Sequence, residues 1–584
     1  MKKNLLFVSV VYLILTLVTS AVMQDISPRH TVFFLADGIL LLIGSKIFDN
    51  EASYYKASLL LTVFLCSVFV IRALTPTPIK VWEINNYISF VFAISNLFWL
   101  FAALCKAIRT GSWQIWPLPV GISGAVLVSP LIILWGYYFS ENAWLNVEGA
   151  MALIETNPAE AYEYMLDRTG LGSVVIIILA YLFMISLLLV YARSISIRHS
   201  SKKSSALAVV FLILNVVLFV RTRDNFVTGI YYETKDYQAN YEEFSKAREH
   251  RKNMAAKLQF ETKGDGGVYI LVIGESENRT RMSAYGYTKP TTPWLDSMKG
   301  NPGLILFERA YSCHVQTVPA LTYALTAKNQ YNDVPLDEAV SLLEVAKAAG
   351  YETIWLSNQV RYGSWGTPVS VIADNADQQV WINTHAGNTL DTDFYDGELV
   401  KRLDDVKITD KTLIILHLMG SHTSYHSRYP STFEKFRADG KSSEYDNSVL
   451  YTDFVIKELW GRIMDIPNFK GLVYFSDHSD GVNFGVGHNP GTFIFDMAYI
   501  PFYMVLSDGY LSSYPERVRQ LRKASNDVFT NDLIFNTMLS VMGIRATGIY
   551  ESENDIGAAS YDSNKERFTT LYGKKHITED TAFY

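Results

Sequence analysis

Cysteine is scarce in this chain, with three residues among 584. Two of them, Cys66 and Cys105, fall inside long apolar runs, so Cys313 stands alone in the polar part of the sequence. A lone cysteine excludes an intramolecular disulfide there, even in an oxidising compartment. The polar part must therefore be stabilised by a hydrophobic core, which its length permits.

Charged residues are also few, at 19% of the chain, and they are unevenly distributed. The formal net charge is −7, which argues against nucleic acid as a partner because phosphate backbones are bound by basic surfaces. Up to residue 220, long uncharged stretches alternate with short charged loops, whereas the rest has the composition of a soluble protein. No internal repeat or low-complexity tract is found in either part.

The uncharged stretches predict a polytopic α-helical membrane domain over residues 1–220. A helix needs roughly 20 apolar residues to cross a bilayer. Seven stretches approach this length: 5–23, 31–47, 57–74, 84–105, 117–139, 170–192 and 204–220. The second stretch contains Asp37, which we expect to lie near a membrane interface or to face the helix bundle.

Lysine and arginine residues predict how the chain is oriented in the membrane. With seven spans, the basic residues fall on one side, from Lys2 and Lys3 to the cluster 193–203, and this side is expected to be cytoplasmic. The loop 141–169 is acidic and is expected on the other side. An odd number of spans then places everything after residue 220 outside the cytoplasmic membrane.

A connection over residues 221–265 and a soluble domain over 266–584 are predicted to follow. The connection is polar, and its mixed-charge stretch Tyr241–Lys257 predicts a solvated helix along the membrane interface. In the soluble domain, strand-like runs alternate with helical patterns such as 336–349 and 447–464. This alternation predicts an α/β domain with a mostly parallel sheet.

Four of the strand-like runs end in polar residues that suit phosphate chemistry. The runs and the residues after them are 268–274 before Glu275, 353–356 before Asn358, 412–419 before His422, and 471–475 before Asp477 and His478. Open α/β sheets place their ligand sites at the carboxyl ends of parallel strands. Carboxylates and imidazoles together are zinc ligands, so the pattern predicts a metal site with an open coordination position.

The candidate nucleophile is Thr317. Pro319 suits the first turn of a helix, so Thr317 is expected at a helix N-terminus, where backbone N–H groups favour phosphate. A bound zinc ion would lower the pKa of the hydroxyl and let it attack phosphorus. Singly, a carboxylate at a strand end is most often solvated, and a threonine before proline is most often a helix cap. The combination, in this order, favours a metal-dependent phosphotransferase.

The order of the motifs resembles that of the phosphoethanolamine transferases. The motifs are E-T-N (155–157), G-E-S (274–276), G-Y-x-x-x-T-T-P (286–293), W-x-x-N-Q (355–359), H-x-x-G-S-H (417–422), Y-D-N-S-x-L-Y-x-D (445–453) and S-D-H (476–478). The resemblance spans residues 140–545 and is closest to the branch that modifies the lipopolysaccharide core heptose. It implies a multi-pass protein of the bacterial inner membrane whose periplasmic catalytic domain has the sulfatase/alkaline-phosphatase fold.

The resemblance also implies roles for individual residues. The implied zinc ligands are Glu275, Thr317, Asp477 and His478, with Thr317 as the phosphoethanolamine acceptor. The implied substrate-binding residues are His422 and His488, which bind the substrate phosphate or a second zinc ion, Asn358 at the donor headgroup, and Thr156 and Glu160 facing the lipid donor. Either histidine is a candidate general acid. The implied partners are phosphatidylethanolamine, membrane lipids, and lipopolysaccharide or another envelope glycan as acceptor.

The chain departs from the family pattern at its D-H-G-E motif and at the basic residue near the headgroup, and other functions remain open. It also lacks the disulfides of many lipid A-modifying members, and its seven predicted spans exceed the five usual in the family. The last two residues of the family's D-H-G-E are here Ser479 and Asp480, and the basic residue expected near the headgroup has Arg361 as its one candidate. A sulfatase would need a C/S-x-P-x-R arrangement, which residues 313–317 lack. A phosphoglycerol transferase or phosphodiesterase of the same superfamily, or a non-catalytic membrane sensor or transporter, is the alternative.

Overall fold

This computed structural model describes residues 28–75, 81–107, 115–156, 161–162, 164, 170–198, 202–359, 368–383 and 394–582. The chain divides into two compact units, each of which is described by itself below. The first unit contains residues 1–150 and 165–235, and the second contains 151–164 and 236–584.

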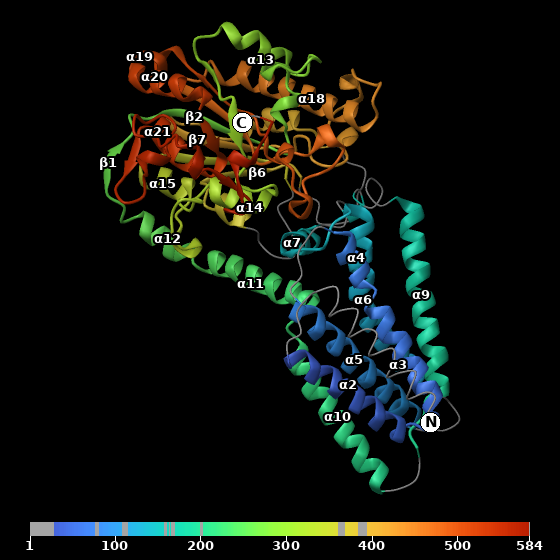
Figure 1. The fold of residues 1–584 in the computed structure, drawn as a ribbon. Helices are drawn as coiled ribbons and strands as arrows, with labels where there is room; N and C mark the ends of the chain where they lie inside the picture. The colour runs from blue at the N-terminus through green and yellow to red at the C-terminus, as the bar shows by residue number, and fades with distance from the viewer. Residues whose placement is uncertain are drawn as a thin grey trace. The chain divides into compact units, whose positions relative to one another are not determined.

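The first unit is built of helices (Figure 1). Their bounds are α2 Pro28–Ile47, α3 Glu51–Leu65, α4 Val68–Leu74, α5 Val81–Ala107, α6 Pro117–Glu141, α9 Leu171–Ser194 and α10 Lys202–Thr222. Helices α7 (Val147–Glu155) and α11 (Phe226–Lys246) each cross from one unit into the other. Five segments of the described chain are long and apolar enough to cross a membrane: Glu51–Leu74, Glu83–Ala107, Pro117–Glu141, Leu171–Ser194 and Ser205–Thr222.

These five segments correspond to five of the seven predicted spans, although the first of them begins at Glu51 rather than at residue 57. The predicted span 31–47 coincides with α2, which is a helix but is not among the five. The predicted span 5–23 lies outside the described residues. An N-terminal region with five apolar helices long enough to span a membrane is therefore confirmed, while the total of seven spans stays a prediction.

Polar side chains in the first unit are buried between helices and bond to one another. Asp37 on α2 is fully buried and accepts a hydrogen bond of 2.8 Å from the Ser89 hydroxyl on α5, so it faces the helix bundle. The Tyr54 hydroxyl on α3 donates to Asn96 on α5, which in turn donates to Asn215 on α10. Such bonds hold membrane helices together because lipid offers polar groups no partner.

The second unit is organised around a seven-stranded sheet of order β3-β9-β8-β2-β7-β5-β6. The strands of this sheet are β2 Gly267–Gly274, β3 Leu304–Leu306, β5 Glu352–Ser357, β6 Gln378–Trp381, β7 Lys411–His417, β8 Phe469–Ser476 and β9 Phe502–Leu506. The remaining strands are β1 Phe260–Lys263, β4 Arg309–Tyr311, β10 Val528–Thr530, β11 Ile544–Ala546, β12 Thr569–Thr570 and β13 Lys575–His576. Strand β9 pairs antiparallel with β3 and β8, and the other pairs of the large sheet are parallel. The predicted α/β domain with a mostly parallel sheet is therefore confirmed.

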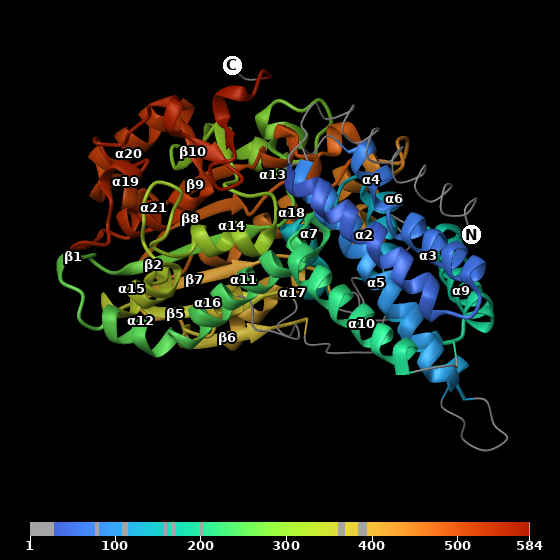
Figure 2. The same cartoon turned by 60° about the horizontal axis from the view of Figure 1, so that its bottom comes forward.

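Helices cover both faces of this sheet (Figures 1 and 2). Their bounds in the second unit are α12 Arg248–Ala255, α13 Pro293–Ser297, α14 Thr317–Ala324, α15 Leu342–Ala348, α16 Pro368–Ala373, α17 Gly397–Lys401, α18 Lys441–Ile463, α19 Asp508–Ser513, α20 Pro515–Lys523 and α21 Ile534–Val541. All eight residues of β2 are buried, and alternate side chains enter two different cores. One core includes residues of α14, α15 and α21, and the other includes residues of α18.

Two predicted helices have different ends in the structure. The pattern at 336–349 contains a short 3-10 turn followed by α15, because the Ser341 hydroxyl accepts from the Glu344 N–H and the Glu344 carboxylate accepts from the Ser341 N–H. Such a capping box marks the first turn of a helix. The pattern at 447–464 belongs to α18, which begins six residues earlier, at Lys441. The mixed-charge stretch Tyr241–Lys257 is indeed helical over most of its length, in α11 and α12.

Candidate active site

Three of the predicted site residues meet where strands β2 and β8 end. These strands are parallel neighbours with Gly274 opposite Ser476, so Glu275 and Asp477 leave the sheet side by side. His478 Nε2 lies 3.4 Å from Glu275 Oε1 and 3.4 Å from Asp477 Oδ2. All three side chains are buried, and one ligand atom from each lies within 4.8 Å of the others. The expectation that strand ends would bring these groups together is confirmed.

Thr317 is the first residue of helix α14 and faces the same cluster. Its hydroxyl donates to Glu275 Oε2 over 3.2 Å and lies 3.3 Å from His478 Nε2. The position at a helix N-terminus is as predicted, and the first N–H groups of the helix have no partner inside it. Thr317, Glu275, Asp477 and His478 thus converge, and their roles as metal ligands remain a prediction.

The cluster has the chemistry that a divalent cation requires. Burial raises the pKa of Glu275 well above its ordinary value, and the neighbouring charge of Asp477 raises it further. Asp477 Oδ1 accepts from the N–H groups of Ser276 and His478, whereas the buried Oδ2 accepts no hydrogen bond in the described structure. Two adjacent buried carboxylates, one with an unsatisfied oxygen, are costly without a cation. With an imidazole and a hydroxyl beside them, they match the ligands of zinc.

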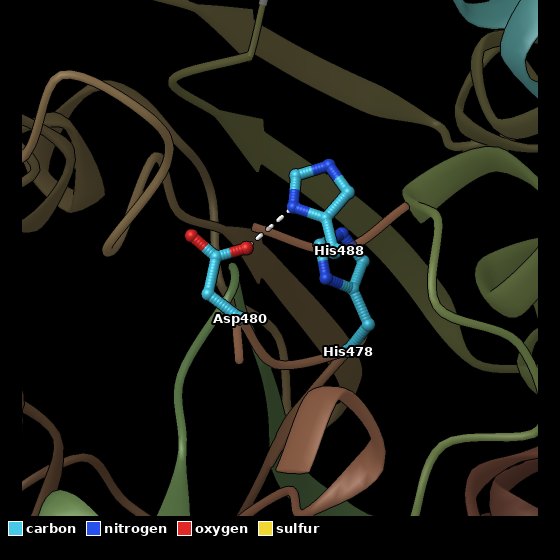
Figure 3. Close-up of side chains that lie close together, drawn as sticks. All are labelled: His478, Asp480 and His488. Carbon is cyan, nitrogen blue, oxygen red and sulfur yellow. Dashed lines mark hydrogen bonds and ion pairs between the residues drawn. The ribbon is translucent and has the colours of Figure 1, made fainter. Parts of the chain in front are cut away.

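A second group, formed by His478, Asp480 and His488, adjoins the first (Figure 3). His488 Nδ1 lies 2.5 Å from Asp480 Oδ1, and the rings of His478 and His488 are 4.3 Å apart between centroids. The hydroxyl of Tyr425 donates to the other oxygen of Asp480. A carboxylate bonded to one ring nitrogen fixes the orientation of an imidazole. Asp480, which the sequence showed as a departure from the family motif, therefore orients a candidate catalytic histidine.

The loop after β7 approaches the cluster from the next strand of the sheet. Gly420 has φ 51°, and a Cβ at this position would lie 2.7 Å from the Glu275 carbonyl oxygen, so glycine is required there. Ser421 N–H donates to that same carbonyl over 2.9 Å. Burial and, to a smaller extent, the positive charge of Arg428 together lower the pKa of His422 to about 3. Arg428 thus places a positive charge close to His422. Sequence reasoning missed this arginine.

Asn358 follows β5 and is held by a carboxylate that sequence reasoning also missed. Its amide nitrogen donates to Asp396 Oδ1 and to the Phe394 carbonyl, each over 2.8 Å. Asp396 is buried and also accepts from the N–H groups of Met419 and Gly420. It therefore links the strand end that carries Asn358 to the loop that carries His422. No sequence motif marked Asp396.

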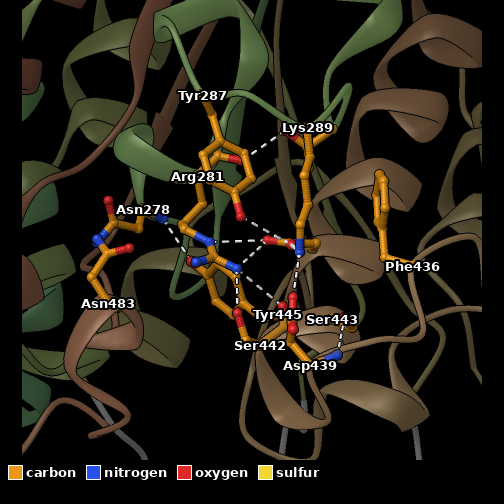
Figure 4. Close-up of polar contacts among 12 residues, drawn as sticks. Asn278, Arg281, Tyr287, Lys289, Phe436, Asp439, Ser442, Ser443, Tyr445 and Asn483 are labelled. Carbon is orange, nitrogen blue, oxygen red and sulfur yellow. Dashed lines mark hydrogen bonds and ion pairs between the residues drawn. The ribbon is translucent and has the colours of Figure 1, made fainter.

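Helix α18 carries the Y-D-N-S-x-L-Y-x-D motif and braces the loop that follows Glu275 (Figure 4). The Tyr445 hydroxyl donates to the Ser276 carbonyl and accepts from the Asn278 N–H, both over 2.7 Å. Asp446 is buried and bonds to Arg281, Lys289 and Tyr287, whose side chains surround it. This motif thus has a positioning role that its sequence did not reveal.

Replacing Asp446 by alanine is expected to destabilise the second unit strongly. The variant would leave Arg281, whose side chain is 9% exposed, without its carboxylate partner. Removing one member of a buried ion pair costs about 3–5 kcal/mol. The unfolding midpoint of the purified protein measures this loss. Asp439→Ala is the matched control, because Asp439 also pairs with Lys289 but is 56% exposed and is expected to contribute at most about 1 kcal/mol. Equal losses in the two variants would contradict the bracing role.

Thr156 bonds within its own segment, and two further predicted residues lie outside the described chain. Thr156 follows α7, and its hydroxyl donates to the Ala152 carbonyl over 2.6 Å. Glu160 and Arg361 lie outside the described residues. The predicted contact of residues 156 and 160 with a lipid donor stays a prediction.

Comparison with known proteins finds similar sequences across the region that contains this site. The Sulfatase family model matches residues 268–544, which contain the seven-stranded sheet and both clusters. Phosphoethanolamine transferase EptC of Escherichia coli (strain K12) is 29% identical over 503 residues, covering 72% of this chain and 84% of EptC. An alignment of this extent includes part of the membrane region as well as the sheet. The chain is therefore similar to phosphoethanolamine transferases over most of its length.

Two solved structures of the family bear on the fold and on the metal. The periplasmic domain of E. coli EptC, solved in complex with Zn, is 27% identical, with a TM-score of 0.50, and the match covers 56% of this chain and 98% of that domain. The integral membrane transferase EptA of Neisseria meningitidis is 19% identical, with a TM-score of 0.55, and the match covers 89% of this chain and 97% of EptA. The EptA match confirms the predicted fold class of a helical membrane region followed by a sulfatase-like domain.

Proposed function

We propose that this transferase moves phosphoethanolamine from phosphatidylethanolamine to an acceptor of the bacterial envelope, through a covalent intermediate on Thr317. The observation that carries the proposal is the Thr317 hydroxyl, which lies at a helix N-terminus and within 3.3 Å of both Glu275 and His478. Lipopolysaccharide, at its core heptose or its lipid A, is the acceptor we favour. The resemblance and the five apolar helices support a position in the inner membrane with the sheet domain in the periplasm.

In the first half-reaction, Thr317 Oγ1 attacks the phosphorus of the donor, and the bond from phosphorus to the diacylglycerol oxygen breaks. The hydrogen bond to Glu275 Oε2 orients the hydroxyl and gives its proton an acceptor. The N–H groups at the start of α14 stabilise charge on the phosphoryl oxygens. Zinc held by Glu275, Asp477 and His478 would act as a Lewis acid that favours the threonine alkoxide. We propose one zinc ion at this cluster. The group formed by His478, Asp480 and His488 could hold a second zinc ion.

Protons for the leaving groups come from the histidines beside the clusters. His488, oriented by Asp480, gives a proton to the departing diacylglycerol oxygen and takes one from the acceptor hydroxyl in the second half-reaction. The acceptor oxygen then attacks the phosphorus, the bond to Thr317 breaks, and the threonine hydroxyl is restored. His422, whose lowered pKa keeps it neutral, binds the substrate phosphate in our proposal, and Asn358 contacts the donor headgroup.

The choice of donor is tested by the release of diacylglycerol. The detergent-purified, zinc-loaded full chain is incubated with phosphatidylethanolamine or with phosphatidylglycerol, and diacylglycerol is measured in each. Release from phosphatidylethanolamine alone supports the proposal. Release from phosphatidylglycerol alone would contradict it and would favour the phosphoglycerol transferase alternative.

Replacing His488 by glutamine is expected to lower turnover by about 10²–10⁴-fold, the usual contribution of a general acid or base. Zinc at the Glu275, Asp477 and His478 cluster should be retained, because His488 is not part of that group. Turnover and zinc content are measured on the same preparation. His426→Gln is the matched control, since the His426 side chain is 57% exposed and lies 3.9 Å from Glu444, outside both clusters. Unchanged turnover in His488→Gln would remove the proton-transfer role.

A further inference from the structure

The segment that carries His488 is unusual in composition and exposure. Residues 481–495 contain no aspartate, glutamate, lysine or arginine. Within this segment, Phe484 is 71% exposed and Val486 is 38% exposed. Among the described residues from 236 to 582, Met464 is the one other large hydrophobic side chain in the exposed class. Phe484 and Val486 thus flank Gly485, and they precede the candidate catalytic residue His488 by four and two positions.

The exposed tip is held in place by the fold. Gly481 N–H donates to the Gly487 carbonyl over 3.0 Å, and Val486 N–H donates to the Gly481 carbonyl over 3.1 Å, which closes the loop. The Asn483 side chain donates to Asp496 and to Thr280, each over 2.8 Å. Gly485 lies in the left-handed region at φ 69° and turns the chain between the two apolar residues. Phe484 is therefore presented to the outside by a well-bonded turn.

More apolar side chains lie behind this tip. Phe493, Ile494 and Phe495 are partly buried against the core below them, and the rings of the two phenylalanines are 5.2 Å apart. A Cβ at Gly481 would contact both Val486 and Ile494, so these two side chains lie close together. The tip and the apolar side chains behind it belong to residues 482–495, which contain no acidic residue, lysine or arginine and which we name the apolar loop.

We propose that the apolar loop inserts its tip into the surface of a phospholipid bilayer. The chain has five apolar helices that suit a membrane, so a bilayer is a partner that every copy would have. An exposed phenylalanine on an uncharged loop gains free energy in the interfacial layer, where aromatic side chains collect. Two exposed side chains are too few for a stable protein interface, which buries about 1,200 Å² or more. A lipid surface is therefore the occupant that the loop fits.

This contact would place His488 at the level of the lipid headgroups. The histidine follows Val486 by two residues in the same bonded loop, and Asp480 holds its ring. The inference rests on the proposed function in one respect, namely that the donor is a lipid of the bilayer. It adds a surface through which the sheet domain would take that donor from the membrane.

The contact is tested directly by fluorescence quenching. A bimane label is attached to Phe484→Cys in the full chain, in a background where Cys66 and Cys105 are replaced by serine and Cys313 is buried. The protein is placed in phospholipid nanodiscs with and without brominated acyl chains, and Met464→Cys serves as the matched control. Quenching at position 484 and not at 464 supports the proposal. Absence of quenching at position 484 overturns the proposal. If the unquenched label also has a blue-shifted emission, a protein surface rather than lipid covers the loop.

A kinetic test separates lipid contact from catalysis. Phe484→Asp is expected to raise the KM for phosphatidylethanolamine in vesicles by about 10-fold or more, because it removes the gain from burying a phenylalanine. Its turnover of a short-chain, monomerically dispersed analogue should match the wild type, and Met464→Asp should leave both values unchanged. Equal losses on the two substrates would overturn the proposal. If the wild-type protein released diacylglycerol from neither substrate, the proposed function would fail, while the quenching result would still decide the lipid contact.

Discussion

Replacing Thr317 by alanine is expected to lower phosphoethanolamine transfer by a factor on the order of 10³ or more, since loss of a nucleophile removes the covalent route. The hydroxyl that is lost lies at the start of α14 and bonds to Glu275, and the variant leaves no hydroxyl at that position. The fold should be retained, because the change removes one hydroxyl and one methyl group from a partly buried residue. Transfer is measured as diacylglycerol released from phosphatidylethanolamine per protein.

Two further variants show whether this loss belongs to the hydroxyl. Thr322→Ala is the matched control on the same helix, because the Thr322 hydroxyl donates to the Val318 carbonyl and takes no part in the cluster. Thr317→Ser keeps the attacking oxygen and should retain part of the activity. Thr317→Ala with turnover close to that of the wild type would show that another group, or water, attacks the phosphorus.

Replacing Asp477 by asparagine is expected to remove most of the zinc. The buried Asp477 Oδ2 accepts no hydrogen bond in the described structure and is the oxygen available to a metal. Loss of an outer-shell partner already lowers metal affinity by about 10–100-fold, so loss of a charged ligand should cost at least as much. At a zinc concentration 100 times the Kd, bound zinc stabilises the wild type by about 2.7 kcal/mol, and the variant should lose this gain. Zinc content after dialysis and the unfolding midpoint with and without zinc measure both effects.

The metal-free proteins provide the internal comparison for this variant. Without zinc, Asp477→Asn should be no less stable than the wild type, because it relieves the repulsion between two adjacent buried carboxylates. Asp532→Asn is the matched control, since Asp532 is also a fully buried aspartate with an oxygen that accepts no hydrogen bond in the described structure, and it belongs to neither cluster. A variant that keeps its zinc, or a control that loses it, would contradict the assignment of the ligands.

The sheet was predictable because buried parallel strands are recorded in the sequence as continuous apolar runs. Strands β2 and β8 are almost entirely apolar, and the polar residues directly after them are the ones that meet in the site. Neighbouring parallel strands end at the same edge, so Glu275, Asp477 and His478 could be expected together from their order in the chain. Thr317 needed one more signal, the proline two residues later.

Other parts of the site depend on contacts between distant segments and left no pattern in the sequence. Asp396 holds Asn358 across a sequence separation of 38 residues, and Tyr445 braces the loop at Ser276 across 169 residues. An isolated aspartate or tyrosine has no periodicity or spacing that predicts such a partner. The start of α15 was missed for a local reason, because the capping box at Ser341 ends the preceding turn. The core-heptose branch and the roles of the individual site residues stay predictions.

The central claim is that Thr317 carries phosphoethanolamine during transfer. Intact mass spectrometry of the detergent-purified, zinc-loaded protein tests it most directly, with the wild type and Thr317→Ala each incubated with phosphatidylethanolamine in the absence of an acceptor. The account predicts an added mass of one phosphoethanolamine group on the wild type and none on the variant. An unmodified wild type that nevertheless releases diacylglycerol, or an adduct of the same mass on Thr317→Ala, would contradict it.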